Sequence, residues 1–331
     1  MINIRYLLKR MKDSDFSKYK DAAARISNST GRGKHAILAD MIISTIRYGS
    51  GPVDYETFEM FNMNAGEKAD VLTIGKNNTL VKELNDPKFL PYFEDKYEFI
   101  LKFNKYINRS WAMIGDSEEH ISDFLKDKDR IIVKPLDECC GRGIRILNLN
   151  EYDSVESLIS ELKEHGTPLM EEIAIQSDLI NKVYPYSINT VRIVTILNDD
   201  KVNIVGSCFR VGRNGNSVDN FNHGGIASII DYRTGKIVTD GFDKYRNEYI
   251  YHPDTGVKFK GFQIPGWDNI RVFLEEVAHI VPEVRYVGWD IALDQDNKPF
   301  LIEGNGYPGQ DVTQYPKLGL GNYAVMKEAL K

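Results

Sequence analysis

The spacing of hydrophobic residues divides the chain into a helical part and a part that mixes strands with helices. Up to residue 108, apolar residues recur every three or four positions, which predicts a mostly helical region. One helix is predicted to follow the loop at 28–34, and another covers about 94–107. The apolar side of the first of these consists of Ile37, Leu38, Met41, Ile42 and Ile46.

The start of the chain also has helical spacing, with basic residues around the apolar ones. A basic amphipathic helix is typical of a membrane-surface or partner contact, or of a terminal helix that packs on its own domain. The segment is short and lacks a Trp or Phe anchor, which favours the second interpretation. Its apolar positions are Ile4, Leu7, Leu8 and Met11.

From residue 109 the pattern changes to short apolar runs that predict strands. A small α+β lobe is predicted over 109–172, and a larger α+β lobe over 173–331, with a cleft between them. The small lobe contains a strand, a tight loop, a returning strand, a helix and a last strand, at 130–136, 137–143, 144–149, 154–165 and 168–176. The larger lobe contains hairpins that turn at 198–200 and 233–235, and a helix at 267–281.

The last predicted hairpin covers 287–308 and carries oxygen-bearing side chains on one face. Asp296-Asn297 suits a two-residue turn, because both residue types tolerate a positive φ. That turn places Asp290 opposite Glu303. The other face would then pair Ile291 with Ile302 and Leu293 with Phe300.

Asn305 lies on the same predicted face as Glu303, because side chains alternate along a strand. Two carboxylates and an amide oxygen are hard ligands that suit Mg²⁺ shared with substrate phosphates. The predicted metal ligands are therefore Asp290, Glu303 and Asn305. The alternative is a strand pair whose outer face is acidic without binding a metal.

Composition narrows the class of protein. The chain has 331 residues, of which 42% are hydrophobic, so it can bury a large core. Its net charge of −6, without a basic block, argues against a nucleic-acid partner. No apolar run reaches the ~18 residues of a membrane span. Three cysteines make no disulfide framework, which favours a cytoplasmic enzyme.

Two features of the small lobe suit a phosphate group. Lys134 ends a predicted strand and supplies a positive charge. The loop that follows contains Gly141, Arg142 and Gly143, and glycine lets the backbone approach phosphate oxygens closely. A surface hairpin that happens to carry a lysine is the alternative.

Three further segments supply candidate polar contacts. Glu171, Glu172 and Ile173 lie where the lobes join, and such a strand suits an adenine edge and ribose hydroxyls, or is an ordinary interdomain strand. Arg192 projects from a strand of the larger lobe and suits a transferring phosphoryl group. In the polar loop 220–225, His223 is either an acid–base group or a hydrogen-bonding loop residue.

The order of these motifs resembles the ATP-grasp superfamily: a V-K-P lysine, a glycine-rich flap, an E-E-I hinge, a strand arginine and a D…E-x-N hairpin. More narrowly, the chain resembles the sugar-transfer-associated ATP-grasp family. The segments that carry this likeness are 187–195 (SINTVRIVT), 223–225 (HGG), 252–256 (HPDTG), 261–267 (GFQIPGW) and 286–305 (YVGWDIAL…LIEGN).

The resemblance implies an α+β ATP-grasp fold that holds ATP and Mg²⁺, with Mn²⁺ as an alternative, between the two lobes. It implies that Lys134 and Lys96 contact the nucleotide phosphates and that 141–143 is the flap over them. It also implies that Arg192, Asn222 and Gly225 lie near the γ-phosphate and the incoming substrate. Many relatives have an arginine two residues before the hairpin aspartate, where this chain has Gly288. We expect Arg192 to replace that charge.

The superfamily's usual reaction is ATP-dependent activation of a carboxylate to an acyl phosphate, followed by attack of an amine. The family implies small-molecule carboxylate and amine substrates, one of them linked to a sugar or a surface-polysaccharide precursor, and enzymes of polysaccharide biosynthesis as partners. The alternatives are a small-molecule kinase on the same fold, or a non-catalytic nucleotide-binding partner of a glycosyltransferase.

Overall fold

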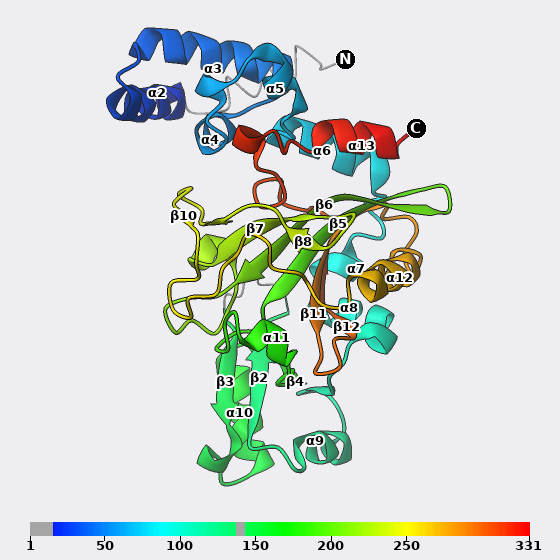
Figure 1. The fold of residues 1–331 in the computed structure, drawn as a ribbon. Helices are drawn as coiled ribbons and strands as arrows, with labels where there is room; N and C mark the ends of the chain where they lie inside the picture. The colour runs from blue at the N-terminus through cyan, green and yellow to red at the C-terminus, as the bar shows by residue number, and fades with distance from the viewer. Residues whose placement is uncertain (1–15, 137–142) are drawn as a thin grey trace.

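The computed structural model describes residues 16–136 and 143–331. The amphipathic segment predicted at the start of the chain, Cys139, Cys140 and two predicted flap residues, Gly141 and Arg142, lie outside this part. Figure 1 shows three stacked regions: helices α2–α6 together with the C-terminal helix at one end, a large sheet in the middle, and a small sheet at the other end.

The N-terminal region is helical, as the apolar spacing predicts. Its elements are α2 (Phe16–Thr30), α3 (Lys34–Tyr48), α4 (Pro52–Thr57), η1 (Met60–Asn62), α5 (Ala65–Asp70) and α6 (Ile74–Leu84). Ile37 and Met41 of α3 are buried in a core shared with α2 and α4, whereas Ile46 is 43% exposed. Gly49 ends α3 in the left-handed conformation that favours glycine.

Helices α7 (Pro91–Glu94) and α8 (Lys96–Phe103), followed by η2 (Asn104–Tyr106), correspond to the helix predicted at 94–107. They pack against the large sheet rather than against α2–α5: the rings of Phe93 and Phe103 lie 5.8 and 5.7 Å from that of Trp289. The predicted boundary of the N-terminal region at residue 108, and that between the lobes at residue 172, stay predictions.

The small sheet has four antiparallel strands in the order β1-β4-β2-β3. These are β1 (Trp111–Met113), β2 (Arg130–Lys134), β3 (Arg145–Asn148) and β4 (Leu169–Glu172), and η3 (Leu149–Glu151) follows β3. Helices α9 (Glu118–Leu125) and α10 (Val155–Glu164) share a core with the sheet, through residues such as Leu158 and Leu162. The strand predicted at 168–176 is therefore shorter than expected.

The large sheet follows the order β10-β9-β7-β6-β5-β11-β12, with β8 paired to β7. Its strands are β5 (Thr190–Asn198), β6 (Lys201–Val211), β7 (Ile226–Asp231), β8 (Lys236–Ile237), β9 (Gly241–Phe242), β10 (Glu248–Tyr249), β11 (Tyr286–Leu293) and β12 (Pro299–Asn305). The remaining helices are α11 (Asp178–Asn181), η4 (Phe221–His223), α12 (Trp267–Ala278), η5 (Pro316–Leu318) and α13 (Tyr323–Ala329). Both predicted hairpins of this lobe are present, as β5–β6 and β7–β8.

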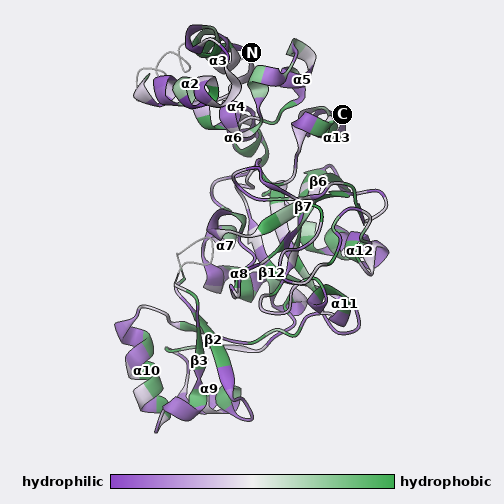
Figure 2. Ribbon diagram, turned by 60° about the vertical axis from the view of Figure 1, so that its left-hand side comes forward, coloured by the Kyte–Doolittle hydropathy of each residue, from purple (hydrophilic) through white to green (hydrophobic). Residues whose placement is uncertain are grey.

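Figure 2 shows hydrophobic residues concentrated in the strands of the sheets, while helices such as α10 carry many hydrophilic residues. This distribution is what burial of apolar surface between helices and sheets requires. Within 16–136 and 143–331, no helix combines the length and apolar character that crossing a bilayer requires.

The β11–β12 hairpin pairs Asp290 with Glu303, as predicted, but its turn differs from the prediction. Its loop has three residues, as the backbone hydrogen bonds show: Asp294 O accepts from Asn297 N at 2.8 Å, and Asp294 N donates to Lys298 O at 3.0 Å. Within the predicted turn only Asn297 has a positive φ, of 60°. Residue Ile302 is left over as a bulge, which restores the register at Glu303.

The predicted apolar pairs are therefore wrong by one residue. Ile291 pairs with Leu301 instead of Ile302, and Leu293 pairs with Pro299 instead of Phe300. The physical reason is the three-residue loop, because a longer connection shifts the strand register and the bulge then corrects it.

Candidate functional site

Asp290 lies in the interior of the large sheet, on strand β11. Its neighbour on β12 is Glu303, and its neighbour on β5 is Arg192. Directly opposed residues of antiparallel strands project from the same face, so the three side chains form one row. The sheet thus brings together two predicted metal ligands and the predicted phosphate-binding arginine.

Two guanidinium groups hold the Asp290 carboxylate. Arg192 Nη2 donates to Asp290 Oδ2 at 2.8 Å, and its Nε donates to the other carboxylate oxygen. Arg210 of strand β6 places its Nη2 2.9 Å from Asp290 Oδ2. All three side chains are at most 9% exposed, so the pairing takes place away from solvent.

A second buried acid lies behind Arg210. Thr190 Oγ1 accepts from Arg210 Nε and Nη2 at 3.0 and 2.8 Å, and Asp219 Oδ2 accepts from the Thr190 backbone N–H at 3.0 Å. Burial raises the pKa of Asp219, and Arg210 opposes that effect. Arg210 is therefore fixed from both sides, by Asp290 and by the Thr190–Asp219 pair.

The two opposed carboxylates have opposite electrostatic surroundings. Burial alone would raise the pKa of Asp290, but Arg192 and Arg210 outweigh it and hold the pKa below its usual value. For Glu303, burial and then repulsion from Asp290 raise the pKa, and the nearby cations compensate only in part. Within the described part of the chain, Glu303 is therefore the carboxylate of the pair whose charge is less fully compensated by cations.

The donor set fits a divalent cation at Glu303 better than at Asp290. Among residues 16–136 and 143–331, no hydrogen bond or ion pair to the half-buried Glu303 carboxylate is formed. Asp290 already accepts three N–H groups, and a carboxylate has about four acceptor positions. Within the same residues, no three His, Cys, Asp or Glu side chains are grouped as a metal site. A cation held here would rest mainly on Glu303.

Asn305, the third predicted ligand, ends β12 opposite Gly288. Its Oδ1 accepts from the backbone N–H of Tyr307 at 2.8 Å. A Cβ at Gly288 would lie 2.9 Å from Pro308 Cβ and 3.3 Å from Arg192 Nη1, so the Arg192 side chain occupies the space above this glycine. The Arg192 guanidinium therefore lies close to position 288, and the expectation that it replaces a charge missing there stays a prediction.

Lys134 is the last residue of β2 and faces the acid of the neighbouring strand. Its Nζ lies 2.7 Å from Glu171 Oε2, and the two side chains are 13% and 3% exposed. Burial lowers the pKa of Lys134, while Glu171 raises it. Although burial alone would raise the pKa of Glu171, Arg109 and Lys134 bring it to about 2.

Arg109, which the sequence did not single out, joins the small sheet to the large one. Its Nε donates to the Glu171 carboxylate. Its Nη1 donates to Leu301 O at 2.9 Å and its Nη2 to Ile302 O at 3.4 Å, on the strand that carries Glu303. The Lys134–Glu171 pair is thereby fixed next to the β11–β12 hairpin.

The predicted hinge residues differ in burial and in their hydrogen-bond partners. Glu171 is buried, whereas Glu172 is exposed and accepts from Ser110 N at 3.0 Å and Ser110 Oγ at 2.8 Å. The backbone hydrogen bond is the main cause that lowers the pKa of Glu172. Ile173 follows β4 and lines a cavity of about 280 Å³ together with Asn108, Glu172, Ile175, Asp294, Gln295 and Asp296.

Lys96 begins α8, where Asp95 caps the helix by accepting from Tyr97 N and Glu98 N at 2.8 and 3.0 Å. Lys96 Nζ donates to Leu136 O at 3.3 Å, so it lies beside the end of the Lys134 strand. Gly143 has φ of +71°, and a Cβ there would lie 3.0 Å from Pro135 Cγ, which accounts for glycine at this position.

Asn222 and His223 are exposed residues of η4 and take no part in these contacts. Asn220 Oδ1 accepts from Asn222 N at 2.9 Å and lies 3.2 Å from His223 Nδ1. A Cβ at Gly225 would lie 2.4 Å from Asp219 O, so the loop packs back on itself. His223 thus has a hydrogen-bonding partner within its own loop, and its two predicted roles stay predictions.

Two residues of the site, Arg109 and Arg210, were not predicted from the sequence. Arg210 carries a signal that was present, because it is a charged residue inside the apolar strand run that ends at Val211. Arg109 has no such local signal, since its partner Glu171 is 62 residues away in sequence.

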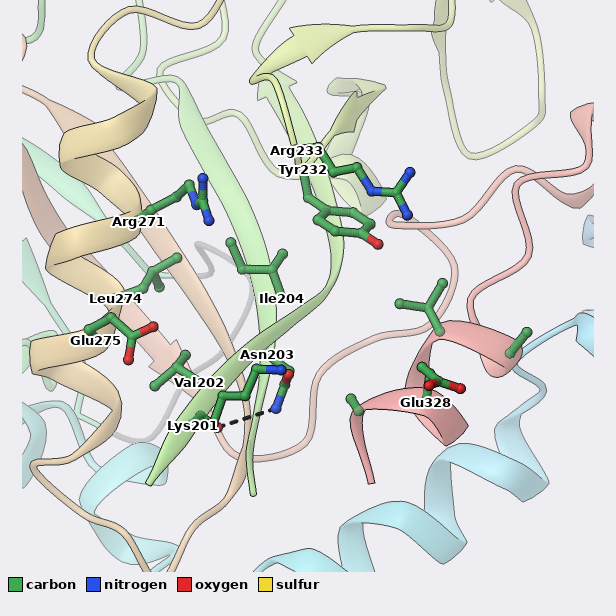
Figure 3. Close-up of a pocket in the computed structure, with 13 residues that line it drawn as sticks. Lys201, Val202, Asn203, Ile204, Tyr232, Arg233, Arg271, Leu274, Glu275 and Glu328 are labelled. Atoms are coloured by element: carbon green, nitrogen blue, oxygen red, sulfur yellow. Dashed lines mark hydrogen bonds between the residues drawn. The ribbon is translucent and has the colours of Figure 1, made fainter. Parts of the chain in front are cut away.

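A separate cavity of about 610 Å³ lies between α12, the start of β6 and α13. Figure 3 shows Arg271 and Glu275 on the helix side and Val202 and Ile204 on the strand side. None of the predicted site residues lines this cavity.

Two antiparallel sheets with a lysine of one beside a carboxylate hairpin of the other match the ATP-grasp arrangement that the motif order predicts. A family model described as "Sugar-transfer associated ATP-grasp" matches residues 75–322. The chain belongs to the sugar-transfer-associated ATP-grasp family, which confirms the predicted family and the α+β ATP-grasp fold. No curated protein sequence matches the chain.

Solved structures give distant likenesses. An L-amino acid ligase from Bacillus licheniformis is 15% identical with a TM-score of 0.41, over 72% of this chain and 48% of that one. A D-alanine–D-alanine ligase from Bacillus anthracis is 15% identical with a TM-score of 0.41, over 80% of this chain and 75% of that one. A D-alanyl-alanine synthetase A from Vibrio cholerae is 12% identical with a TM-score of 0.43, over 72% and 64%. The chain thus spans about half of the first of these proteins.

Proposed function

We propose that the protein is an ATP-dependent carboxylate–amine ligase that forms an amide through an acyl phosphate. ATP would lie at the junction of the small and large sheets, with its phosphates between Lys134 and the Glu303 hairpin. This assignment agrees with the family membership and with the names of the distant structural neighbours.

The observation that carries the proposal is the bridge made by Arg109. It bonds to Glu171, the partner of Lys134, and to the carbonyls of Leu301 and Ile302 next to Glu303. The charge of Glu303 also raises the pKa of Lys134, which is a further sign that the two groups are near each other. A cation and an incompletely neutralised carboxylate at one junction suit a nucleotide phosphate with its metal.

Each residue has a role that follows from its charge. Lys134 and Arg192 would offset the negative charge of the transferring phosphoryl group, and Arg210 would hold Arg192 and Asp290 in place. Glu303 and Asn305, with the remaining acceptor position of Asp290, would hold Mg²⁺ or Mn²⁺. Such an ion supplies charge neutralisation between the phosphates. Glu172 and Ile173 would contact the ribose and adenine.

In the reaction, a carboxylate oxygen of the substrate attacks the γ-phosphorus, and the bond to ADP breaks. An amine then attacks the acyl carbon, phosphate leaves with the bonding electrons, and the amine nitrogen loses a proton. The predicted flap at 141–143 would exclude water from the acyl phosphate, and Lys96 would contact the phosphates. Asn222 and His223 would contact the incoming substrate from the η4 loop.

The family description suggests that one substrate is linked to a sugar, such as a surface-polysaccharide precursor, and that enzymes of polysaccharide biosynthesis are partners. We place the protein in the cytoplasm, because a sequence with only three cysteines is not typical of a disulfide-stabilised secreted protein and because ATP is available there.

The proposal is tested by trapping the intermediate. The protein is incubated with ATP, Mg²⁺ and a panel of sugar-linked carboxylates, with and without hydroxylamine. A ligase gives a hydroxamate that depends on ATP and carboxylate. A stable phosphorylated product that forms without an amine would instead establish the kinase alternative, and an absence of ATP turnover with every substrate would favour a non-catalytic role.

A further inference from the structure

The Glu171 carboxylate has two cationic partners where one would neutralise it. Lys134 Nζ lies 2.7 Å from Glu171 Oε2, and Arg109 donates its Nε to the same oxygen. The side chains of Glu171 and Arg109 are both 3% exposed, so solvent contributes little to either charge. One carboxylate with two cations leaves one positive charge in excess at this point.

The two cations differ in how firmly they are held. Arg109 has three contacts, because its other two nitrogens donate to the carbonyls of Leu301 and Ile302 at 2.9 and 3.4 Å. Among the described residues, Lys134 forms its only hydrogen bond with Glu171. A lysine amine at the end of a flexible side chain can change partners, whereas a planar guanidinium group that donates to three acceptors stays in place.

A lysine that moves to a phosphate must leave its carboxylate behind. A buried carboxylate that loses its only partner is strongly destabilised, and this cost would reduce the affinity for the nucleotide. Glu171 would not be left alone, because Arg109 stays bonded to it. The excess charge is therefore available to a ligand without exposing an unpaired acid.

We propose that Arg109 is a positioning residue that serves as the standing counter-ion of Glu171 and thereby releases Lys134 to bind an ATP phosphate. The inference rests on the proposed function, because it requires ATP at the sheet junction. It adds a role for a residue that lies outside all of the motifs on which the family resemblance depends.

The experiment is a double-mutant cycle on the affinity for Mg·ATP, measured by titration calorimetry on the full chain. Arg109→Gln should weaken binding at least about tenfold, because Lys134 must then leave an otherwise unpaired Glu171. In a protein that also carries Glu171→Gln, adding Arg109→Gln should weaken binding less than about threefold, since no carboxylate is left to be neutralised.

Arg109→Lys serves as the conservative variant. It keeps the charge beside Glu171 but not the fork that also reaches the β12 carbonyls, so it should recover most of the lost affinity if counter-charge is what matters. Thermal unfolding of each variant shows whether it is folded, and the lysine variant keeps the test informative if Arg109→Gln is not.

Equal losses in the presence and absence of Glu171→Gln, or no recovery with Arg109→Lys, would mean that Arg109 acts only by tying β12 to the small sheet, and would overturn the inference. If the unmodified protein itself binds no Mg·ATP, the proposed function fails and the inference fails with it. The two failures are thus distinguished by the first titration.

Discussion

The small sheet and the large sheet each contain one buried carboxylate held by two cations, yet the two clusters are built differently. In the small sheet, Glu171 is shared by Lys134 and Arg109. In the large sheet, Asp290 is shared by Arg192 and Arg210. Arg192 comes from β5, which is adjacent to β11, and Arg210 comes from β6, the strand beyond β5.

The two clusters differ in whether one of their cations can leave the carboxylate. The guanidiniums around Asp290 occupy both carboxylate oxygens, and the strand register fixes them, so this cluster is rigid. Among the residues that the structure describes, Lys134 bonds only to Glu171, and we propose that it leaves this partner when a nucleotide binds. We interpret the Asp290 cluster as a fixed, positively charged part of the site and the Glu171 cluster as the part that changes when a ligand binds.

The largest expected effect tests the rigidity of the Asp290 cluster. Asp290→Asn removes the buried carboxylate that Arg192 and Arg210 share, and it leaves Arg210 only the weaker ion pair with Asp219 at 3.5 Å. It should lower the free energy of unfolding by about 3–5 kcal/mol. Urea unfolding followed by tryptophan fluorescence measures the loss. Asp296→Asn, at an acid that is 75% exposed on the same hairpin, is the control and should change stability by less than about 0.5 kcal/mol. A loss below about 1 kcal/mol for Asp290→Asn would contradict the claim.

A second effect follows from the pKa of Glu171, about 2 against the usual 4.5. When a carboxyl group has a lower pKa in the folded protein than in the unfolded protein, its charge stabilises the fold. The stabilisation is complete at a pH above the pKa of the unfolded state, and it is lost as the pH falls through the pKa of the folded state. At pH 7, Glu171→Gln should therefore cost about 3 kcal/mol.

The measurement is the difference in unfolding free energy between the unmodified protein and Glu171→Gln as a function of pH. The difference should be constant above about pH 5 and shrink steadily as the pH falls toward 2. A difference that does not depend on pH would show that the Glu171 charge contributes nothing to stability.

The third prediction separates the two clusters directly. Lys134→Met should reduce kcat/KM for ATP about 100-fold or more, because the positive charge that Lys134 would bring to the phosphates is removed. It should lower the unfolding free energy by less than about 1.5 kcal/mol, since Arg109 still neutralises Glu171. A stability loss as large as that of Asp290→Asn would remove the distinction between a rigid and a responsive cluster.

The smallest effect concerns the space above Gly288. Gly288→Ala would place a Cβ 2.9 Å from Pro308 Cβ and 3.3 Å from Arg192 Nη1, and should cost about 1–3 kcal/mol. Gly33→Ala is the control, because a Cβ there meets nothing within 4 Å and φ is −63°. Equal thermal midpoints for the two variants would show that the space above Gly288 is not filled by Pro308 and Arg192.

Much of the architecture could be predicted from local patterns. The strand alternation around 198–200 and 233–235 yielded both hairpins, because turn residues and apolar runs are local signals. The Asp290–Glu303 pair was also predicted, although by a two-residue turn that is absent. The bulge at Ile302 compensated for the longer loop, and nothing in the apolar pattern marks a bulge.

The chemistry of the site was harder to predict, because it depends on contacts between distant residues. Asp290 was predicted as a metal ligand, and the sequence gives no sign that Arg192 and Arg210, 98 and 80 residues earlier, already hold it. Glu171 and Glu172 were predicted together as hinge residues, and the sequence did not indicate that Glu171 pairs with Lys134. Pairings of this kind follow from the tertiary fold and not from local spacing.

The most direct test of the account is a crystal structure of the protein with Mg²⁺ and a non-hydrolysable ATP analogue. We predict that the phosphates lie at the sheet junction and that Lys134 Nζ has moved from Glu171 to a phosphate oxygen. Arg109 should still be bonded to Glu171, and Glu303 should bind the metal. Nucleotide bound instead in the cavity between α12 and α13, against Arg233 and Arg271, would contradict the account.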